Sequence, residues 1–529
     1  MRDAVLVIAD VTGIQSYVFS SNRLRDNVGA SELVARATGV WAAEAFNALG
    51  PTNCTGVGRH GRLTITPGVR YEDDDMVAEL LYSGGGNVVA LVRDQELARQ
   101  WAAALSTRVL VEAPGLSIVC VYSQPFGWDP AGADLSARIG QLLDNELRHV
   151  KQYRAASTPL LGLGVSAECR ATGLPAVDID DTDGDKPISR EIEARLAALP
   201  RADQRFDAML HDYVGRDRLG FKRPSKLDDL GRSMGESSYI AVVHADGNGL
   251  GKRFKAAWAA RSNREAITQV RALSDAVHKA GMVALGRALA PLITREGGLK
   301  APFDGQEHLP VRPIIYGGDD ITFACDGRLG VRLAAAFVEE LEGATASLPD
   351  GGGPVTSAAG VAIVKTHYPF RRAYDLAEEL CKGAKDTVGR TASSLDWHVA
   401  MSGLLADIGT LRTREYHTTD DEGVARSLTV RPLPLHSTQT PWRSWAQFRE
   451  TVEALQTSAE WAGRRNKVKR LREVLRDGGS RTQQFLSLYG IGRLPGYSLA
   501  PTTLHERGWL DGVCGYFDPI ELLDFYISL

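Results

Sequence analysis

Short apolar runs that end in an aspartate occur twice along the chain, at residues 4–10 (AVLVIAD) and 239–246 (YIAVVHAD). Downstream of each run lies a second apolar segment with a glycine-rich turn, YSGGGNVVALV at 82–92 and IYGGDDITFAC at 315–325. A further apolar strand and a helix follow in both halves. The two copies lie farther apart along the chain than the units of a solenoid repeat do. The shared order of elements therefore predicts a duplicated domain.

The second copy has the more regular pattern of apolar and polar positions. Two apolar runs joined by the GGDD turn, flanked by segments with helical periodicity, give the β-α-β-β-α-β order of a ferredoxin-like sheet. We therefore predict an α+β fold with two ferredoxin-like domains. In the second copy the predicted elements are strands at 239–246, 311–317, 320–325, 358–364 and 394–400, and helices at 252–290 (with a candidate break at Ser262–Asn263), 329–345 and 369–387.

The pattern divides the chain into four regions. They are a first ferredoxin-like domain at 1–155, a linker domain at 156–235, a second ferredoxin-like domain at 236–401 and a helical C-terminal domain at 402–529. The linker lacks clear periodicity and is predicted to be irregular. Its acidic segment, VDIDDTDGDK, is predicted to be a solvated loop, because an EF-hand alignment fails at its first and last ligand positions.

Composition and charge narrow the function classes. The chain has 529 residues, a net charge of −4, 44% hydrophobic residues and 24% charged residues, so no global positive field attracts nucleic acid. Six cysteines occur without any C-x-x-C pair, which indicates a reducing compartment and no zinc site. No apolar run reaches the length of a membrane span, and we expect a cytoplasmic protein with no membrane contact.

Three carboxylates form the main candidate for chemistry. Asp246 is the last residue of a predicted strand, and Asp319 and Asp320 lie in the turn of the neighbouring hairpin. Crowded carboxylates repel one another unless a cation neutralises them, and their oxygens suit Mg²⁺ or Mn²⁺. Gly317 and Gly318 leave room for a triphosphate to approach the backbone. Two metal ions could then assist phosphoryl chemistry here.

The alternative is that GGDD is a polar hairpin turn, because glycine and aspartate are ordinary turn residues. The residues that follow Asp246 favour the nucleotide site. There the segment HADGNGLGKRF supplies Gly247, Asn248 and Gly249 directly after the strand, as a candidate phosphate-binding loop.

An ordered set of motifs carries a family resemblance. In the second copy these are VVHADGNGLGKRF, RPIIYGGDDITFAC, SAAGVAIVKTHYPFRRAYDLAEELCKGAK and SSLDWHVA; in the first they are DVTGIQSYVFSSNRLRDNVGASELV and YSGGGNVV. Together they resemble the two palm domains of the GGDD polymerase–cyclase family, the large subunit of type III CRISPR interference complexes. The resemblance spans residues 3–400 and is distantly shared with the GGDEF cyclases. It implies that two ATP molecules bind between the palms and are joined into cyclic oligoadenylates.

The resemblance also assigns roles in the second copy. Asp246 and Asp319 are the expected metal ligands, and Asp320 is a further ligand or orients one. Gly317 and Gly318 are expected beneath the phosphates. Lys385, in GAKD, corresponds to a lysine of the family that contacts the triphosphate.

The first copy keeps the glycines but lacks the hairpin acids. Gly84, Gly85 and Gly86 remain, Asn87 stands where the second acid would be, and Asp10 is retained. We expect this half to hold a nucleotide on its glycine turn without metal catalysis. The duplication then gives an asymmetric pair in one chain.

Two departures from the family pattern concern a nuclease domain and a zinc ribbon. The first palm begins at once, so a histidine–aspartate nuclease domain is not expected, and His211-Asp212 in the linker is interpreted as a chance dipeptide. In the segment AECRATGLPA, Cys169 is kept but Thr172 stands where a second zinc-binding cysteine would be. We therefore expect a remnant of a zinc ribbon without zinc.

Several functions stay open at this stage. The leading one is a metal-dependent synthase of cyclic oligonucleotides from ATP, in antiviral defence, with two Mg²⁺ or Mn²⁺ ions. The alternatives are a scaffold subunit that binds RNA and other CRISPR effector subunits, and a mononucleotide cyclase. The oligomeric state is not predicted.

Weaker signals have structural interpretations. The basic helix at 464–476 is expected to be a solvated face rather than an RNA or acidic-partner site, with Val468, Leu471 and Leu475 turned inward. Trp128, Trp442 and Trp445 are expected in the core.

Overall fold

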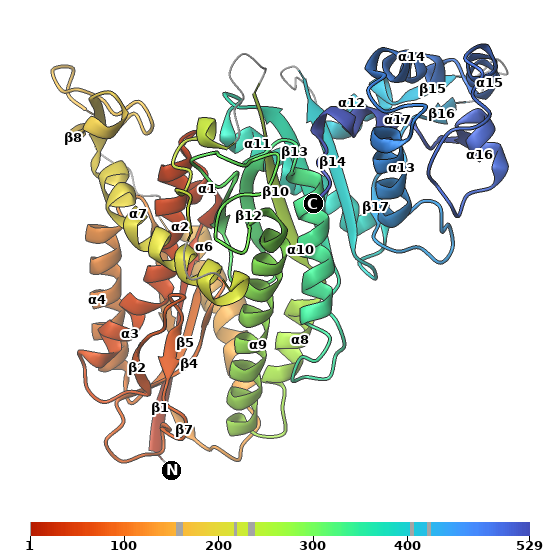
Figure 1. Cartoon of the computed structure of the whole chain (residues 1–529). Helices are drawn as coiled ribbons and strands as arrows, with labels where there is room; N and C mark the ends of the chain where they lie inside the picture. Colours follow the sequence, from red (N-terminus) through yellow and green to blue (C-terminus); the bar gives the residue numbers. More distant parts are fainter. Residues whose placement is uncertain (1, 155–161, 216–218, 231–237, 402–406, 420–424) are drawn as a thin grey trace.

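The computed structural model describes residues 2–154, 162–215, 219–230, 238–401, 407–419 and 425–529. Two palm domains lie side by side, and a C-terminal domain covers the side of the second palm that faces away from the first (Figure 1). The α+β architecture with two ferredoxin-like domains is confirmed.

The sheet of the second palm has the order β11-β12-β10-β13-β14-β17. Its first four strands are antiparallel and have the ferredoxin-like order predicted from the sequence, and β14 runs parallel to β13. Helices α9 and α10 make the two crossovers. The predicted helix at 252–290 is divided at Ser262, whose side chain caps α9 by accepting from the Glu265 N–H. The elements are β10 (Tyr239–Gly247), α8 (Leu250–Trp258), α9 (Asn263–Leu289), β11 (Val311–Ile315), β12 (Ile321–Asp326), α10 (Gly330–Ala344), β13 (Ser357–Lys365), α11 (Phe370–Thr387) and β14 (Ser394–Ala400).

The first palm repeats this arrangement. Its strands follow the order β4-β5-β1-β6. The first of these strands along the chain, β1, lies between β5 and β6, just as β10 lies between β12 and β13 in the second palm. The predicted duplication is thus present in the topology. The elements are β1 (Arg2–Thr12), α1 (Ile14–Val18), α2 (Leu24–Thr38), α3 (Val40–Asn47), β2 (Cys54–Val57), β3 (Leu63–Ile65), β4 (Ala78–Gly84), β5 (Asn87–Val92), α4 (Gln95–Glu112), β6 (Ser117–Tyr122), β7 (Phe126–Trp128), α5 (Leu135–Gln141) and α6 (Arg148–Tyr153).

The two palms interlock through their equivalent crossover helices. Helix α2 of the first palm packs against β11 of the second, and α9 of the second packs against β4 of the first. A charged cluster lies in this interface. The carboxylate of Glu79, on β4, has no exposed surface and accepts from Arg264 at 2.7 Å and from Arg271 at 2.9 Å, both on α9. Each palm therefore completes the core of the other.

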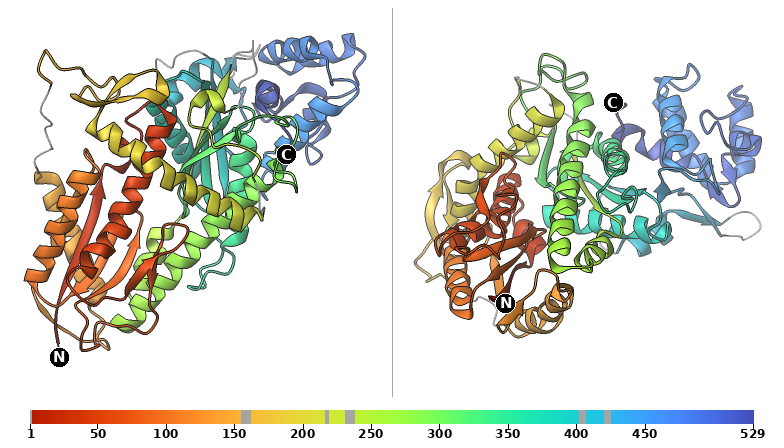
Figure 2. Two further views of the ribbon diagram at one scale, coloured as in Figure 1. Left: turned by 60° about the vertical axis from the view of Figure 1, so that its left-hand side comes forward. Right: turned by 90° about the horizontal axis from the view of Figure 1, so that it is seen from below.

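The linker is more regular than predicted. It contains the hairpin β8 (Ala176–Asp180) and β9 (Lys186–Ser189) and the 20-residue helix α7 (Arg190–Met209). The prediction of an irregular segment was wrong because charged residues and Pro200 obscure the helical spacing of the buried Ile192, Ala198, Ala202 and Phe206. Figure 2 shows α7 running across the first palm toward α9. Gly29 permits a close crossing, since a β-carbon there would lie 2.0 Å from the Arg195 carbonyl oxygen.

The acidic segment of the linker is anchored rather than fully solvated. Asp180 is buried and pairs with Arg25 of α2, and Arg23 lies 3.4 Å from the same carboxylate oxygen. Nearby, Cys169 is buried at a turn in which the Gly173 N–H donates to its carbonyl oxygen. The Thr172 hydroxyl donates to Ser189 at 3.0 Å, so this position serves the hairpin.

The C-terminal domain is mostly helical but also contains a small sheet that was not predicted. Its strands are only two or three residues long, too short to produce a periodic pattern. Strand β17 (Leu433–Pro434) extends the sheet of the second palm beside β14. The remaining elements are α12 (Ile408–Glu415), β15 (His417–Thr419), β16 (Ala425–Ser427), α13 (Trp445–Thr457), α14 (Arg465–Arg476), α15 (Gly479–Leu488), α16 (Thr502–Arg507), β18 (Trp509–Leu510), β19 (Val513–Cys514) and α17 (Phe517–Leu522).

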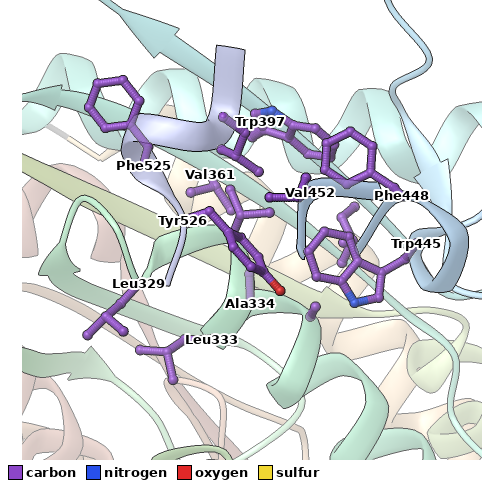
Figure 3. Close-up of a cluster of buried hydrophobic side chains, with 14 of the residues drawn as sticks. Leu329, Leu333, Ala334, Val361, Trp397, Trp445, Phe448, Val452, Phe525 and Tyr526 are labelled. Carbon is purple, nitrogen blue, oxygen red and sulfur yellow. The ribbon is translucent and has the colours of Figure 1, made fainter. Parts of the chain in front are cut away.

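A large apolar contact fixes this domain on the second palm. Figure 3 shows Trp445 and Phe448 of α13 and Tyr526 near the C-terminus facing Trp397 and side chains of α10. The centroids of the Trp397 and Phe448 rings lie 4.9 Å apart. As predicted, Val468, Leu471 and Leu475 form the buried face of α14, and Trp128, Trp442 and Trp445 are buried.

Candidate active site between the two palms

The GGDD segment forms the turn between β11 and β12, at the edge where β10 ends. The antiparallel register pairs Ala245 with Ile321, which brings Asp320 beside Asp246. Asp319 lies over the backbone after Asp246, because a β-carbon on Gly247 would come within 2.7 Å of the Asp319 carboxylate. The fold therefore gathers the three acids in one place, and Gly247 provides the space for Asp319. The nucleotide contact expected of Gly247 stays a prediction.

The environment of the turn disfavours ionisation. Burial, and then the charge of Asp246, raise the pKa of Asp319 to about 6. Partial desolvation, and then the charges of Asp246 and Asp319, raise the pKa of Asp320 to about 8. About half of the Asp320 side chain (51%) remains accessible, so a ligand can reach its carboxylate. Carboxylates held this way gain most from a cation.

Lys385 supplies the nearest positive charge. Its side chain is buried, pairs with the Asp246 carboxylate, and also donates to the Gly247 carbonyl oxygen at 3.1 Å. Lys385 therefore lies beside the acids. Its ammonium group contacts Asp246, so any contact with a triphosphate stays a prediction.

The chemistry of the donor set fits a hard divalent cation. The carboxylates of Asp246, Asp319 and Asp320 offer oxygen ligands and repel one another when ionised. Within the described ranges, no group of three or more His, Cys, Asp or Glu side chains is already arranged around a common metal position. The assignment of metal ligands therefore stays a prediction.

Asn248 and Gly249 shape the loop after β10. The Asn248 side chain donates to Thr356 Oγ1 at 3.1 Å, and its backbone N–H donates to the Thr356 carbonyl oxygen at 2.7 Å. Gly249 has a φ of 77° and begins α8, a conformation that favours glycine. Asn248 thus holds the loop to Thr356, the residue before β13, and the contact of Asn248 and Gly249 with phosphate stays a prediction.

A cleft of about 640 Å³ lies between the two palms. The first palm contributes its glycine turn, Gly84, Gly85 and Gly86, and the second contributes Gly317 and Asp320. Sequence reasoning paired these two turns, and the fold places both on one cavity. Asn87 pairs with Asp10 in the β1–β5 register, in the position that Asp320 takes beside Asp246.

Two features of the site escaped the sequence analysis. Lys151 of α6 pairs with Asp10, as Lys385 pairs with Asp246 in the second palm. The interval of 139 residues between Asp246 and Lys385 is nearly repeated between Asp10 and Lys151, which is a signal that could have identified Lys151. His278 of α9 lines the cleft beneath Gly317, and no motif marks it.

The His211-Asp212 dipeptide lies at a contact between the linker and the first palm. Asp212 lies 3.0 Å from His60 Nε2 and 3.3 Å from Arg59, so it connects the linker to the first palm.

In the part of the chain that the structure describes, no helix is both long and apolar enough to cross a membrane.

Comparisons with known proteins agree with this architecture. The Csm1–Csm4 cassette in complex with pppApApA matches with a TM-score of 0.51 and 13% identity, over 98% of this chain and 69% of the matched chain. Csm1 from T. onnurineus matches with a TM-score of 0.51 and 13% identity, over 100% of this chain and 70% of that one. At this identity the likeness concerns the fold. No curated protein matches the sequence significantly.

A family comparison addresses the sequence of the second palm itself. The matching family is described as Cas10/Cmr2, second palm domain. The match runs from the start of β10 to the residue before β14. Residues 239–393 of this chain are thus similar to the second palm domain of the Cas10/Cmr2 family.

Proposed function

We propose that this chain is a metal-dependent nucleotidyltransferase that joins ATP molecules into a cyclic oligoadenylate and releases pyrophosphate. One observation carries the proposal. A single cleft is lined by Gly317 and Asp320 of the acidic turn in one palm and by the acid-free glycine turn of the other. Such a cleft suits two triphosphates that face each other, one of which reacts.

The reaction forms one phosphodiester bond at each step. The 3′-hydroxyl of one nucleotide loses its proton to water and attacks the α-phosphorus of the other, the bond to the β-phosphate bridging oxygen breaks, and pyrophosphate leaves with its electron pair. Asp246, Asp319 and Asp320 would hold Mg²⁺ or Mn²⁺, which would lower the pKa of the attacking hydroxyl and neutralise charge on the phosphates. In the proposal, Lys385 supplies a fixed positive charge near the phosphates.

The first palm acts as a binding site for the second nucleotide. Gly85 and Gly86 have φ values of 58° and 83°, so glycine is favoured at both positions. Their turn lines the cleft without carboxylates. Position and orientation, rather than metal chemistry, are its contribution.

The fold relatives support both the substrate and an assembled state. The Csm1–Csm4 cassette with the same palm arrangement was solved with pppApApA, a linear oligoadenylate. We infer that this chain also works beside other CRISPR effector subunits and RNA in antiviral defence. A scaffold role without synthesis is the second candidate, and it predicts binding of partners without product.

Incubation of the full-length chain with radiolabelled ATP and Mg²⁺ or Mn²⁺, alone and with candidate partner subunits and RNA, tests the proposal. Cyclic oligoadenylate and pyrophosphate are the expected products. Asp319→Asn with Asp320→Asn should abolish both, whereas Asp304→Asn, at an exposed turn, should leave them unchanged. Cyclic AMP as the product would instead establish the mononucleotide cyclase, and no product under any condition would contradict both enzymatic readings.

A further inference from the structure

One side chain in the cleft carries a hydrogen-bonding atom that no group of the described residues uses. His278 lies on α9, is half-buried and lines the cleft between the palms. Its Nδ1 lies 2.7 Å from the carbonyl oxygen of Gly317, the first glycine of the GGDD turn. Because a carbonyl oxygen can only accept a hydrogen bond, Nδ1 carries the proton.

The second ring nitrogen, Nε2, is therefore an acceptor. Burial, and then the charge of Arg62, lower the pKa of His278 to about 4, so the imidazole is neutral at physiological pH. The Nε2 atom is buried, and among the described residues it has no hydrogen-bond partner. A buried acceptor without a donor is unfavourable, so this atom is suited to a ligand that brings one.

The charged groups around His278 already have partners. Arg62, His60 and Arg205 are the neighbours whose charges act on the imidazole. Each of them lies within ion-pair distance of a carboxylate: Arg62 with Asp275, His60 with Asp212, and Arg205 with Glu32. These pairs hold the neighbouring side chains in place around the cleft, and among the described residues none of them donates to Nε2.

The glycine turn positions this imidazole. Gly317 has a φ of 108°, and a β-carbon at this position would lie 3.0 Å from His278 Cε1. Glycine at 317 thus lets the ring lie directly beneath the turn. One helical turn along α9, the buried Met282 also lines the cleft and offers apolar surface, as a nucleobase requires.

On the basis of the proposed function, we propose that His278 Nε2 reads the base of a nucleotide bound in this cleft, by accepting a hydrogen bond from the 6-amino group of adenine. Guanine and hypoxanthine present a carbonyl oxygen at that position, so two lone pairs would face each other. His278 then selects ATP over GTP and ITP and is a specificity-determining residue. Asp320, whose proposed task is separate, lines the same cleft.

Two ligands that differ only in the amino group test this inference. They are the α,β-methylene analogues of ATP and of purine-riboside triphosphate, neither of which can release pyrophosphate. We expect the full-length chain to bind the ATP analogue about tenfold more tightly, the effect of one neutral hydrogen bond. His278→Phe should remove that tenfold difference by weakening the ATP analogue alone.

The purine analogue is the internal control for folding, since its affinity for His278→Phe should stay within about twofold of that of the wild type. Met282→Leu is the matched control on the same helix and should change both affinities equally. His278→Gln, which restores an acceptor, should recover part of the discrimination. Equal weakening of both analogues by His278→Phe, as a ribose contact or a steric effect would give, overturns the inference alone. A wild-type chain that binds neither analogue overturns the proposed function, and this inference with it.

Discussion

Gly281 of α9 lies so close to Gly318 that a β-carbon at position 281 would come within 1.9 Å of the Gly318 carbonyl oxygen. The crossover helix therefore lies directly beneath the acidic turn, with no side chain between them. The position of Asp319 and Asp320 depends on this contact, because both follow Gly318 in the turn.

Replacement of Gly281 by alanine should displace the turn. We expect Gly281→Ala to lower the free energy of unfolding by about 1–3 kcal/mol, as overpacking does, and to reduce cyclic oligoadenylate formation by at least about tenfold. Thermal unfolding and product analysis measure the two effects. Gly343→Ala in α10, where a β-carbon meets nothing within 4 Å, should be neutral or stabilising by up to about 1 kcal/mol. Equal behaviour of the two variants would contradict this role of Gly281.

The acidic turn should make stability depend on pH. The folded chain raises the pKa of Asp319 to about 6 and of Asp320 to about 8, so it binds these protons more tightly than the unfolded chain. Ionisation of the two groups therefore opposes folding. This opposition is absent below about pH 4, and stability decreases as the pH rises from there to about pH 8.

Metal removal and the matching variant test this dependence. In EDTA, Asp320→Asn should raise the midpoint of thermal unfolding at about pH 8 and leave it unchanged at about pH 4. Added Mg²⁺ should stabilise the wild-type chain more strongly as the pH rises over this range, because the cation competes with protons. A stabilisation by Asp320→Asn that is equal at both pH values would contradict the raised pKa.

The buried carboxylate in the palm interface should be essential for stability. Glu79→Gln leaves Arg264 and Arg271 without their shared charge, and breaking a buried pair typically costs about 3–5 kcal/mol. We expect a lower midpoint of thermal unfolding and weaker nucleotide binding, since the interface also forms the cleft. Glu296→Gln, at an exposed position after α9, should change stability by less than about 0.5 kcal/mol.

The two lysine–aspartate pairs should separate the tasks of the palms. Lys385→Met is expected to abolish product, because it removes the charge beside the acidic turn. Lys151→Met should leave one nucleotide bound and weaken the second, so that higher ATP concentrations are needed for the same rate. Equilibrium binding stoichiometry and the dependence of rate on ATP distinguish the variants. Identical loss in both would contradict the proposed asymmetry.

The sequence predicted those features that are local and periodic. The strand before Asp246, the GGDD turn and the break at Ser262 each lie within one short segment, and the structure confirms the elements. The sheet order followed from the arrangement of these elements, and the cleft joins the two turns that were paired by their glycines.

The features that escaped prediction depend on tertiary contacts. Helix α7 buries Arg195 against α2, so its inward face does not look apolar in sequence. Lys151 follows a π-helical segment at Leu142–Leu147, which shifts the helical spacing before α6. His278 is marked only by its hydrogen bond with Gly317, which is distant along the chain. Such residues are recognised from the fold.

The crossing of α2 and α9 into opposite palms has a consequence for concentration dependence. A cyclase built from two separate palms has to dimerise, so its active fraction falls when it is diluted. Here both palms belong to one chain and share a core, which fixes their effective concentration. The cleft is therefore assembled in every folded molecule. The rate of the proposed synthesis per molecule should then not depend on the concentration of the protein.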